Sequence, residues 1–432
     1  MRYVLRAIIC VSATATAAVA DGAAVVFNSP TVVNPSVGVG RLAIADFNLD
    51  ERPDLAVIEF GLSVGTFLSD EGALSFQPVG LLPGQPFDPQ IAAADLNNDG
   101  LPDIVAVTGA IEFQTFIQQP GGTFQQSGTG IPGEFYFPTF VLGQMNDDAF
   151  IDLVTANPQG VHLNDGSGQF VTVGGLADTP IFSNLHAANL DPGGLTDVLR
   201  TTGLPTVVQV LRNDGDGVLT LSATVSAPTN TASAGGDFNA DGVTDIAMID
   251  YAPANAIVVR FGQPAATLGP PVAFSTGPYP SAIAAGDVNN DGFDDIIVAM
   301  SAAGGVSNIR VYASLGNGTF ALAGSSPVPV DDSGGGGPHI FDMATADFDR
   351  DGRTDLAAAA FGYGLVLVFN VTPFGDLDGD GDADLDDFPL MAACLSGPAV
   401  PAPNGCAATD LDADNDVDVA DVAVFQNSFG EP

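Results

Sequence analysis

A nine-residue pattern of Asp, Asn and Gly recurs along this 432-residue chain and constrains its fold more than any other feature. The pattern is D-x-N-x-D-G-x-x-D, and its clearest copy runs from Asp95 to Asp103. Copies begin at residues 46, 95, 144, 189, 237, 287 and 347, which are spaced about 45 to 60 residues apart. Self-similarity at such a period is typical of a solenoid, an array or a β-propeller.

Each repeat also carries the signals of four short β-strands. A run of small apolar residues precedes the loop, as in residues 91–94, and a β-branched run follows it, as in residues 103–107. A third run, such as residues 207–211, leads through a Gly/Asn turn to a fourth, which opens with a bulky residue such as Phe170 or Phe320. Four short strands in each repeat are the pattern of a propeller blade.

The two ends of the repeat region predict how the ring closes. The seventh repeat has only three strands, the last at residues 365–369, whereas Phe27 precedes the first loop with the spacing of a fourth strand. We therefore expect residues 23–28 to complete the last blade, which leaves no exposed sheet edge. The predicted fold is an all-β, seven-bladed propeller over residues 21–370, closed by the N-terminal strand.

The recurring loops have the chemistry of calcium sites. Carboxylates and amides at positions 1, 3, 5 and 9, with a carbonyl at position 7, offer the hard oxygen ligands that Ca²⁺ prefers, and Gly allows the sharp turn. Asp-rich turns also form without metal, but five well-formed copies in register favour binding. The predicted ligands are Asp46, Asn48, Asp50, Asp54, Asp95, Asn97, Asp99, Leu101, Asp103, Asp237, Asn239, Asp241, Val243, Asp245, Asp287, Asn289, Asp291, Phe293, Asp295, Asp347, Asp349, Asp351, Arg353 and Asp355.

Two copies have lost the first carboxylate. Gln144 and Asn189 stand where the other loops have Asp. We expect these two loops to be empty turns.

On these motifs the chain resembles FG-GAP/VCBS repeat proteins, whose seven-bladed propeller is similar to the head of integrin α-subunits. The resemblance covers residues 23 to about 370. It implies that the loop joins the first two strands of each blade and that the ion is mainly structural.

The C-terminus follows a different pattern after a linker at residues 371–375. Two twelve-residue loops match the EF-hand spacing, and a short apolar helix is predicted after each, at residues 388–395 and 422–429. The predicted ligands are Asp376, Asp378, Asp380, Asp382, Asp384, Asp387, Asp410, Asp412, Asp414, Asp416, Asp418 and Asp421. With the five better propeller loops, the expected total is about seven Ca²⁺ ions.

This region, residues 376–432, resembles a type I dockerin domain. The resemblance implies binding to a cohesin module and thereby attachment to a scaffold. Loop positions 10 and 11, often Ser-Thr in that family, are Leu385-Asp386 and Val419-Ala420 in this chain. The alternative is a calcium-folded terminal cap without a partner.

The N-terminus predicts secretion. Residues 1–20 combine Arg2 and Arg6, about 13 apolar residues and an A-x-A site, as a signal peptide does. That stretch is shorter than the roughly 20 residues needed to span a membrane, and no other segment is long and apolar enough. Cys394 and Cys406 would then meet an oxidising compartment, where a disulfide between them is expected.

Composition narrows the function classes. The chain has 52 acidic and 10 basic residues and a formal charge of −42, so nucleic acids and anionic membranes are excluded as partners. The leading hypothesis is a binding or adhesion module for a protein or glycan, tethered through the tail. The alternative is a polysaccharide lyase or hydrolase, although His162, His186 and His339 match no catalytic spacing, and Tyr136, Tyr251, Tyr279 and Arg260 are not placed by sequence.

Overall fold

The computed structural model describes residues 25–428 with interruptions. The undescribed internal residues are 34–38, 60–62, 71–72, 82–89, 108–111, 134–138, 157–158, 176–182, 192–193, 204–205, 229–231, 252–254, 264–265, 278, 301–306, 329–339, 361–363, 373–376, 378–384, 386, 399, 402, 404–405, 407–408, 410 and 412–415. The predicted signal peptide therefore lies outside the described residues.

The repeats form seven sheets of four antiparallel strands each, so the predicted propeller is confirmed. Blade 1 contains β2 (Val39–Ala45), β3 (Asp54–Glu59), β4 (Ser63–Asp70) and β5 (Ala73–Leu81), and blade 2 contains β6 (Ile91–Ala94), β7 (Asp103–Val107), β8 (Glu112–Gln119) and β9 (Thr123–Pro132). Blade 3 contains β10 (Phe140–Gly143), β11 (Asp152–Ala156), β12 (Gln159–Asn164) and β13 (Phe170–Gly174). Blade 4 contains β14 (Ser183–Ala188), β15 (Asp197–Gly203), β16 (Thr206–Asn213) and β17 (Leu219–Ser226).

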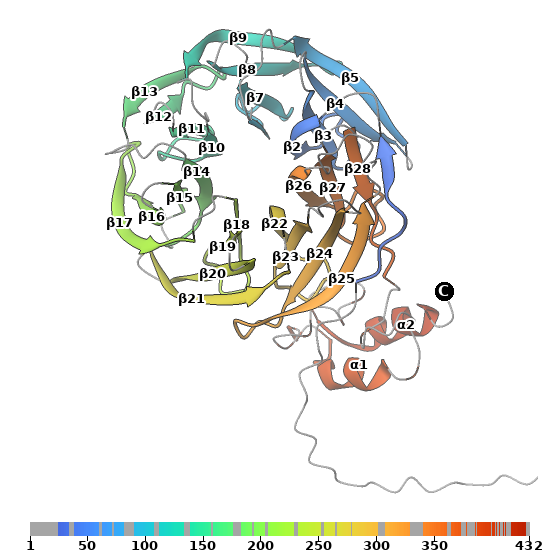
Figure 1. The fold of residues 1–432 in the computed structure, drawn as a ribbon. Coiled ribbons are helices and arrows are strands. Elements are labelled where there is room, and N and C mark those ends of the chain that lie inside the picture. Colours follow the sequence, from blue (N-terminus) through green and yellow to red (C-terminus); the bar gives the residue numbers. More distant parts are fainter. Residues whose placement is uncertain are drawn as a thin grey trace, which may run out of the picture.

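Blade 5 contains β18 (Ser233–Gly236), β19 (Asp245–Asp250), β20 (Ala256–Gln263) and β21 (Thr267–Ser275). Blade 6 contains β22 (Pro280–Gly286), β23 (Asp295–Met300), β24 (Ser307–Ser314) and β25 (Phe320–Val328). Blade 7 contains β26 (Ile340–Ala346), β27 (Asp355–Ala360), β28 (Gly364–Val368) and β1 (Thr31–Val33). First strands such as β10, β18 and β22 surround the centre of the ring, and fourth strands such as β9, β13 and β17 form its rim (Figure 1).

The N-terminal segment closes the last blade, as predicted, but the predicted bounds of the closing strand were wrong. The strand β1 pairs with β28, with Thr31 opposite Leu367. Residues 26–28 continue beside residues 369–371 through an isolated bridge between Phe27 and Asn370. The ladder is interrupted at Pro30, which has no backbone N–H to donate.

The core lies between the blades. Among the described residues, buried apolar side chains form one cluster at each of the seven blade interfaces. Strand β23 shows why the second strands read as continuous apolar runs. Ile297 faces the interface with blade 7, whereas Ile296 and Val298 face the interface with blade 5. Because successive side chains point to opposite faces of a strand, both sets are buried.

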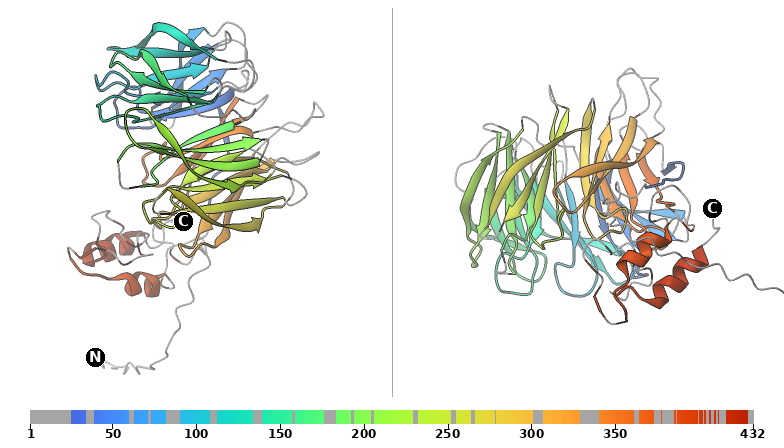
Figure 2. Two further views of the ribbon diagram at one scale, coloured as in Figure 1. Left: turned by 90° about the vertical axis from the view of Figure 1, so that its left-hand side faces the viewer. Right: turned by 90° about the horizontal axis from the view of Figure 1, so that it is seen from below.

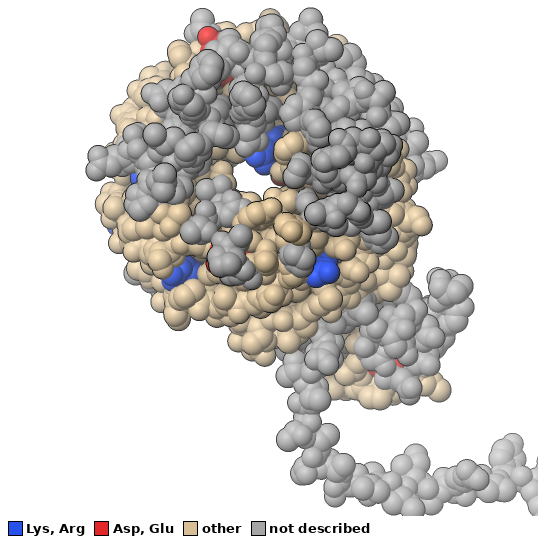
Figure 3. All heavy atoms as spheres, viewed as in Figure 1, with Lys and Arg blue, Asp and Glu red and all other residues tan. Residues whose placement is uncertain are grey.

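The ring has an open centre on the face turned to the viewer in the space-filling view (Figure 3). A basic side chain lies beside the opening, and it is Arg because the chain has no Lys. Few acidic side chains of the described residues are seen on this face.

The C-terminal region carries two helices outside the ring, α1 (Phe388–Cys394) and α2 (Val419–Ser428) (Figure 2). They share a small core around Met391, Val417 and Phe425. The predicted disulfide between Cys394 and Cys406 is formed, with Cα atoms 5.5 Å apart. None of the helices in the described part of the chain is long and apolar enough to span a bilayer.

The second helix begins three residues earlier than predicted. Its first turn contains Asp421, whose carboxylate accepts a hydrogen bond from the amide of Asp418 at 2.7 Å. A carboxylate in the first turn is favourable because it opposes the positive end of the helix dipole.

Candidate metal centres

Five of the seven nine-residue loops share an unusual backbone. Position 4 has a positive φ in Leu49, Asn98, Ala240, Asn290 and Arg350, between 51° and 63°. Position 6 also has a positive φ, at 66° in Glu51 and between 78° and 86° in the four Gly residues. These five loops, which start at residues 46, 95, 237, 287 and 347, are called the intact loops below. Two left-handed residues per loop fold its amides and carboxylates inward, and position 6 favours Gly for that reason.

Side chains inside an intact loop bind its own backbone. In loop 95, the Asp95 carboxylate accepts hydrogen bonds from the amides of Asp99 and Gly100, at 3.2 and 2.9 Å. The Asp99 carboxylate accepts the Asn97 side-chain amide at 3.0 Å and the backbone amide of Leu101 at 2.9 Å. The intact loops at 46, 237 and 287 repeat these contacts. Loop 347 repeats the backbone-amide contacts and has Asp349 in place of Asn at position 3. The side chains at positions 1, 3 and 5 are therefore held together on one loop.

The Asp at position 9 is also a structural hydrogen-bond acceptor. In all seven blades it is buried and accepts two backbone amides at 2.7 to 3.1 Å, from position 2 of its own loop and from the end of the third strand. In loop 95 these donors are Leu96 and Gln118, and the acceptor is Asp103. The position-9 carboxylate therefore ties the loop to the blade whether or not the loop is intact.

Burial and neighbouring charge disfavour the ionised form of these carboxylates. Burial, opposed by the two backbone hydrogen bonds, raises the pKa of Asp245 and Asp355 to about 7 and that of Asp103 to about 6, and neighbouring loop carboxylates add to the rise. Burial likewise raises the pKa of Asp295 well above its ordinary value, and the charges of Asp291 and Asp287 add to the rise. A bound cation would offset this cost by stabilising the charged form.

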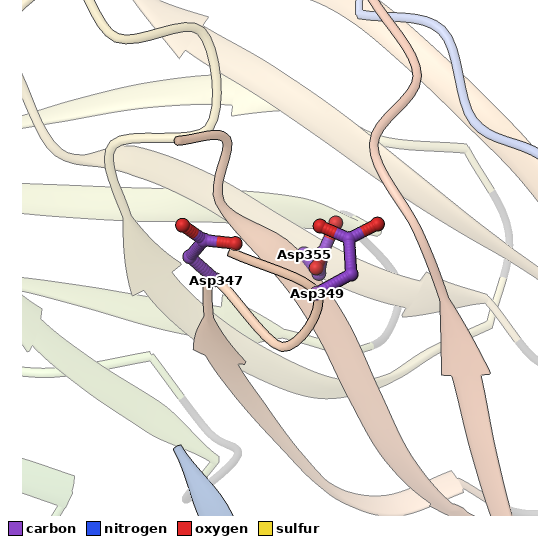
Figure 4. A group of neighbouring side chains, drawn as sticks. All are labelled: Asp347, Asp349 and Asp355. Carbon is purple, nitrogen blue, oxygen red and sulfur yellow. The ribbon is translucent and has the colours of Figure 1, made fainter. Parts of the chain in front are cut away.

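Among the described residues of the propeller, loop 347 is the one in which three carboxylates converge. Ligand oxygens of Asp347, Asp349 and Asp355 lie within 4.8 Å of one another, on the connection between β26 and β27 (Figure 4). Several hard oxygen donors converging on one point fit Ca²⁺. Which residues bind an ion in each loop stays a prediction, as does the role of the carbonyls of Leu101, Val243, Phe293 and Arg353.

The two loops without the first Asp differ from the intact ones. In loop 144, the Gln144 side-chain amide donates to the carbonyl of Asp148 at 2.5 Å. Neither Asp147 nor Ala149, at positions 4 and 6, has a positive φ. An amide donor at position 1 thus replaces a carboxylate acceptor, and a hydrogen bond between neutral groups closes the loop. In loop 189, Asn189 donates its side-chain amide to the carbonyl of Gly242 in the next loop.

The sequence reading missed position 2. Position 2 is a large apolar residue in every copy, and its side chain packs in the core between two blades. These residues, each at most 3% exposed, are Phe47, Leu96, Met145, Leu190, Phe238, Val288 and Phe348. The signal was present, because all seven copies of the motif have a large apolar residue there.

A side chain near the end of the third strand, called a pin residue below, donates a hydrogen bond to the loop of the preceding blade. Gln118 and Asn164 donate their side-chain amides to the position-2 carbonyls of the preceding blade, Phe47 and Leu96, at 2.6 and 2.7 Å. Ser314 and Asn370 make the equivalent bonds at 2.6 and 2.8 Å. The pin residues also give their backbone amides to the position-9 Asp of their own blade, so each of them connects its own loop to the loop of the preceding blade.

Neighbouring loops also touch directly. Position 4 of one loop reaches position 6 of the next, from Asn98 to the carbonyl of Ala149 and from Asn290 to that of Gly352, both at 2.9 Å. Where the last blade meets the first, Arg350 forms an ion pair with Glu51 at 3.0 Å. Both side chains are well exposed, so this pair contributes little stability.

In the two longer loops of the tail, the last Asp also accepts the backbone amide of position 2. The position-12 residues Asp387 and Asp421 accept the position-2 amides of Leu377 and Leu411, at 2.6 and 2.7 Å. Carboxylate oxygens of Asp416, Asp418 and Asp421 lie within 4.8 Å of one another, which fits a cation site. The other predicted tail ligands, Asp376, Asp378, Asp380, Asp382, Asp384, Asp410, Asp412 and Asp414, lie outside the described residues.

The side chains considered for catalysis are dispersed. His162 is buried between Thr155 and Thr172, at 2.9 and 2.8 Å, and burial lowers its pKa to about 4. His186 contacts Ser233 on the adjacent inner strand at 2.7 Å. Arg260 donates to the carbonyls of Ser226 and Gly269. None of the hydrogen bonds or ion pairs found in the described residues joins these three groups to a carboxylate, and His339 and Tyr136 lie outside that part.

Three segments of the chain match the family described as FG-GAP-like repeat: residues 46–106, 237–298 and 295–358. These segments contain the intact loops and omit the loops at 144 and 189. No curated protein matches the chain in sequence.

Solved structures resemble the fold at low sequence identity. A lectin from Agrocybe aegerita, described as recognising non-reducing terminal N-acetylglucosamine, is 14% identical over 75% of this chain and 86% of its own, with a TM-score of 0.50. Raptor from Chaetomium thermophilum is 12% identical over 80% of this chain and 29% of its own, with a TM-score of 0.55. Virginiamycin B lyase from Staphylococcus aureus is 12% identical over 80% of this chain and 100% of its own, with a TM-score of 0.51.

A lectin and a lyase among these structures show that the fold leaves function open. The repeats, sheets and loops together show that this protein is a seven-bladed β-propeller, three segments of which match the FG-GAP-like repeat.

Proposed function

We propose that this protein is a secreted, calcium-stabilised binding module whose propeller recognises a glycan or a protein. The observation that carries the proposal is the set of five intact loops, which lie on one face of the ring and share two left-handed positions. In loop 347, one of the five, three carboxylates also converge. Ions there stabilise the ring and leave the connections on the opposite face free for recognition.

The calcium in this proposal is structural. Each loop is bonded to the strands of its own blade, and most are also bonded to a neighbouring blade, so an ion in the loop would hold interfaces rather than contact a ligand. Five ions would occupy the propeller and two the tail. The lectin among the similar structures supports a glycan as one ligand class, although only the fold is shared.

The tail is proposed to tether the propeller to a cohesin-like scaffold module. Position 10 of each tail loop carries an apolar side chain in water, Leu385 at 76% exposure and Val419 at 80%. Exposed apolar groups at equivalent positions of two related units suit a partner surface. The calcium-folded cap remains the alternative.

The binding hypothesis can be tested with glycan and protein arrays probed with the full chain in calcium. Reproducible binding to one class supports the proposal, and absence of binding to either class contradicts it. The same polysaccharides are then analysed for released products, since product formation would favour the enzyme hypothesis instead.

The tether is tested separately. The full chain and its Leu385→Ser/Val419→Ser variant are compared for capture by immobilised cohesin modules in calcium. Capture of the native chain alone supports the tether, and no capture of the native chain contradicts it.

A further inference from the structure

Two exposed tyrosines meet at the junction of blades 5 and 6. Tyr251 follows β19 and Tyr279 precedes β22, and their ring centroids are 6.5 Å apart with planes inclined by 56°. The rings are exposed to 42% and 45%. Strand β19 starts at one nine-residue loop and β22 ends at the next, so both tyrosines lie on the ring face opposite the metal loops.

Packing does not account for this pair. Pairs such as Phe47–Phe124 and Phe113–Phe140 lie within the blade interfaces, where burial stabilises them. Tyr251 and Tyr279 keep nearly half of their surface in water, so they gain little from the hydrophobic effect. A large aromatic surface that stays exposed is available to a ligand.

The backbone beneath the pair is strained and tightly held. Tyr279 has a φ of 65°, in a region that bulky residues rarely adopt. The buried Thr276 joins the two connections by donating its amide and hydroxyl to the carbonyl of Asn255, at 3.0 and 3.2 Å. Strain that the surroundings enforce is found at ligand sites more often than elsewhere.

The connection that leads to Tyr279 also binds a cationic side chain. Arg310 donates from Nη1 to the carbonyl of Thr276 at 2.6 Å, and Tyr312 donates its hydroxyl to the same oxygen at 3.2 Å. Arg310 forms no ion pair with a carboxylate of any described residue, despite the formal charge of −42. A guanidinium has five N–H donors, so most of those of Arg310 can serve a ligand.

We propose that Tyr251 and Tyr279 form a subsite for one saccharide ring of a neutral glycan, with Arg310 donating hydrogen bonds to its oxygens. The inference rests on the proposed binding function and names its ligand class and place. A saccharide ring has apolar C–H faces that stack on aromatic rings and a rim of hydroxyls that accept from a guanidinium. The acidic surface repels polyanions but not a neutral glycan. A proline-rich peptide would use the same rings, but it offers fewer acceptors to Arg310.

The test compares the full-length native chain with Tyr251→Ala, Tyr279→Ala and Tyr279→Gly. Leu221→Ala, at a site 52% exposed on the rim strand β17, is the control. Each protein is probed on an array of neutral oligosaccharides, and the best oligosaccharide is titrated by calorimetry. We expect each tyrosine variant to lose about tenfold in affinity, as in stacking of one planar ring on one aromatic side chain, and the control to lose nothing.

The glycine variant separates binding from folding. Gly adopts a φ of 65° without strain, so Tyr279→Gly is expected to melt at or above the native temperature while binding more weakly. Native affinity in the tyrosine variants overturns the subsite and leaves the binding function intact. Binding of the native chain to proline-rich peptides instead of saccharides overturns the ligand class, whereas no binding to saccharides, peptides or proteins overturns the proposed function itself.

Discussion

Loops 95 and 144 follow one another around the ring. They have the same structural role in their blades but differ in the residues that close the loop. Both have a buried position-9 Asp that accepts two backbone amides, and both have a position-2 side chain in an interface core. Only loop 95 has a carboxylate at position 1 and left-handed residues at positions 4 and 6. Blade architecture and ion binding are thus separable properties of one motif.

The comparison also shows how a blade keeps its loop when the residue at position 1 is not Asp. The amide of Gln144 closes loop 144 by donating to a carbonyl, where Asp95 closes its own loop by accepting amides. A neutral closure needs no cation to offset clustered charge. Position 9 has no such replacement, and it is Asp in all seven copies of this chain.

Calcium removal should have the largest effect. At an ion concentration about ten times Kd, each filled site adds roughly 1.4 kcal/mol, so five intact loops together add several kcal/mol. We expect metal-depleted protein to melt roughly 10 °C lower than calcium-saturated protein, measured by calorimetry. An unchanged melting temperature would show that the intact loops hold no stabilising ion.

Loss of the position-9 carboxylate should be the largest single-residue effect, and it should be the same in both loop types. Asp103→Ala and Asp152→Ala each leave two buried backbone amides without an acceptor, at about 1–3 kcal/mol per amide. We expect each variant to lose about 2–5 kcal/mol in the free energy of unfolding, measured by urea denaturation in metal-depleted protein. If Asp152→Ala left the free energy of unfolding unchanged, the blade that contains loop 144 would not depend on this residue.

The position-5 carboxylate gives the sharpest contrast, because its hydrogen bonds are matched. Asp99 and Asp148 each accept one Asn side-chain amide and one backbone amide. Asp99→Ala should lower the free energy of unfolding in calcium by about 1–2 kcal/mol more than Asp148→Ala does, because only loop 95 loses an ion. In metal-depleted protein the two variants should be equally stable, and a difference there would assign the effect to hydrogen bonding.

The stabilisation by calcium should depend on pH. In the metal-free fold the raised pKa values of Asp103 and Asp245 mean that these groups stabilise fully below the unfolded pKa of 3.8 and lose that contribution as pH rises through about 6 to 7. Bound Ca²⁺ stabilises the ionised form and opposes this loss. The difference in melting temperature between calcium-saturated and metal-depleted protein is therefore expected to be larger at pH 7.5 than at pH 5.5.

Buried His162 does not disturb that measurement. Burial lowers its pKa to about 4, so its contribution falls as the pH drops below about 6.5. The shift is the same with and without calcium and cancels in the difference. A calcium effect equal at both pH values would mean that the position-9 carboxylates do not take part in binding.

Restoration of the lost site should have the smallest effect on stability but a clear stoichiometry. The double variant Gln144→Asp/Ala149→Gly gives loop 144 the full nine-residue pattern, including the residue that tolerates a positive φ. Native mass spectrometry should count one more bound ion than in the native chain. Ala149→Gly alone is the control and should bind no additional ion.

The sequence predicted most of the fold because the information was local and repeated. The strands at residues 91–94 and 103–107 coincide with β6 and β7, and the disulfide and both helices were predicted at the right places. The prediction was less accurate where a contact joins distant residues. The closing strand was placed at residues 23–28, but its register depends on β28, some 330 residues away, and on the break at Pro30.

The sequence by itself determined the number of blades, the position of each loop and the oxygen donors that each loop can offer, because these follow from spacing and residue type. Only the tertiary structure decided that the position-9 Asp is a structural acceptor in every blade, that Gln118 and Asn164 pin neighbouring loops, and that Tyr251 and Tyr279 meet. Those relations join residues from different strands or blades, and sequence spacing along one strand carries no record of which side chains the closed ring brings together.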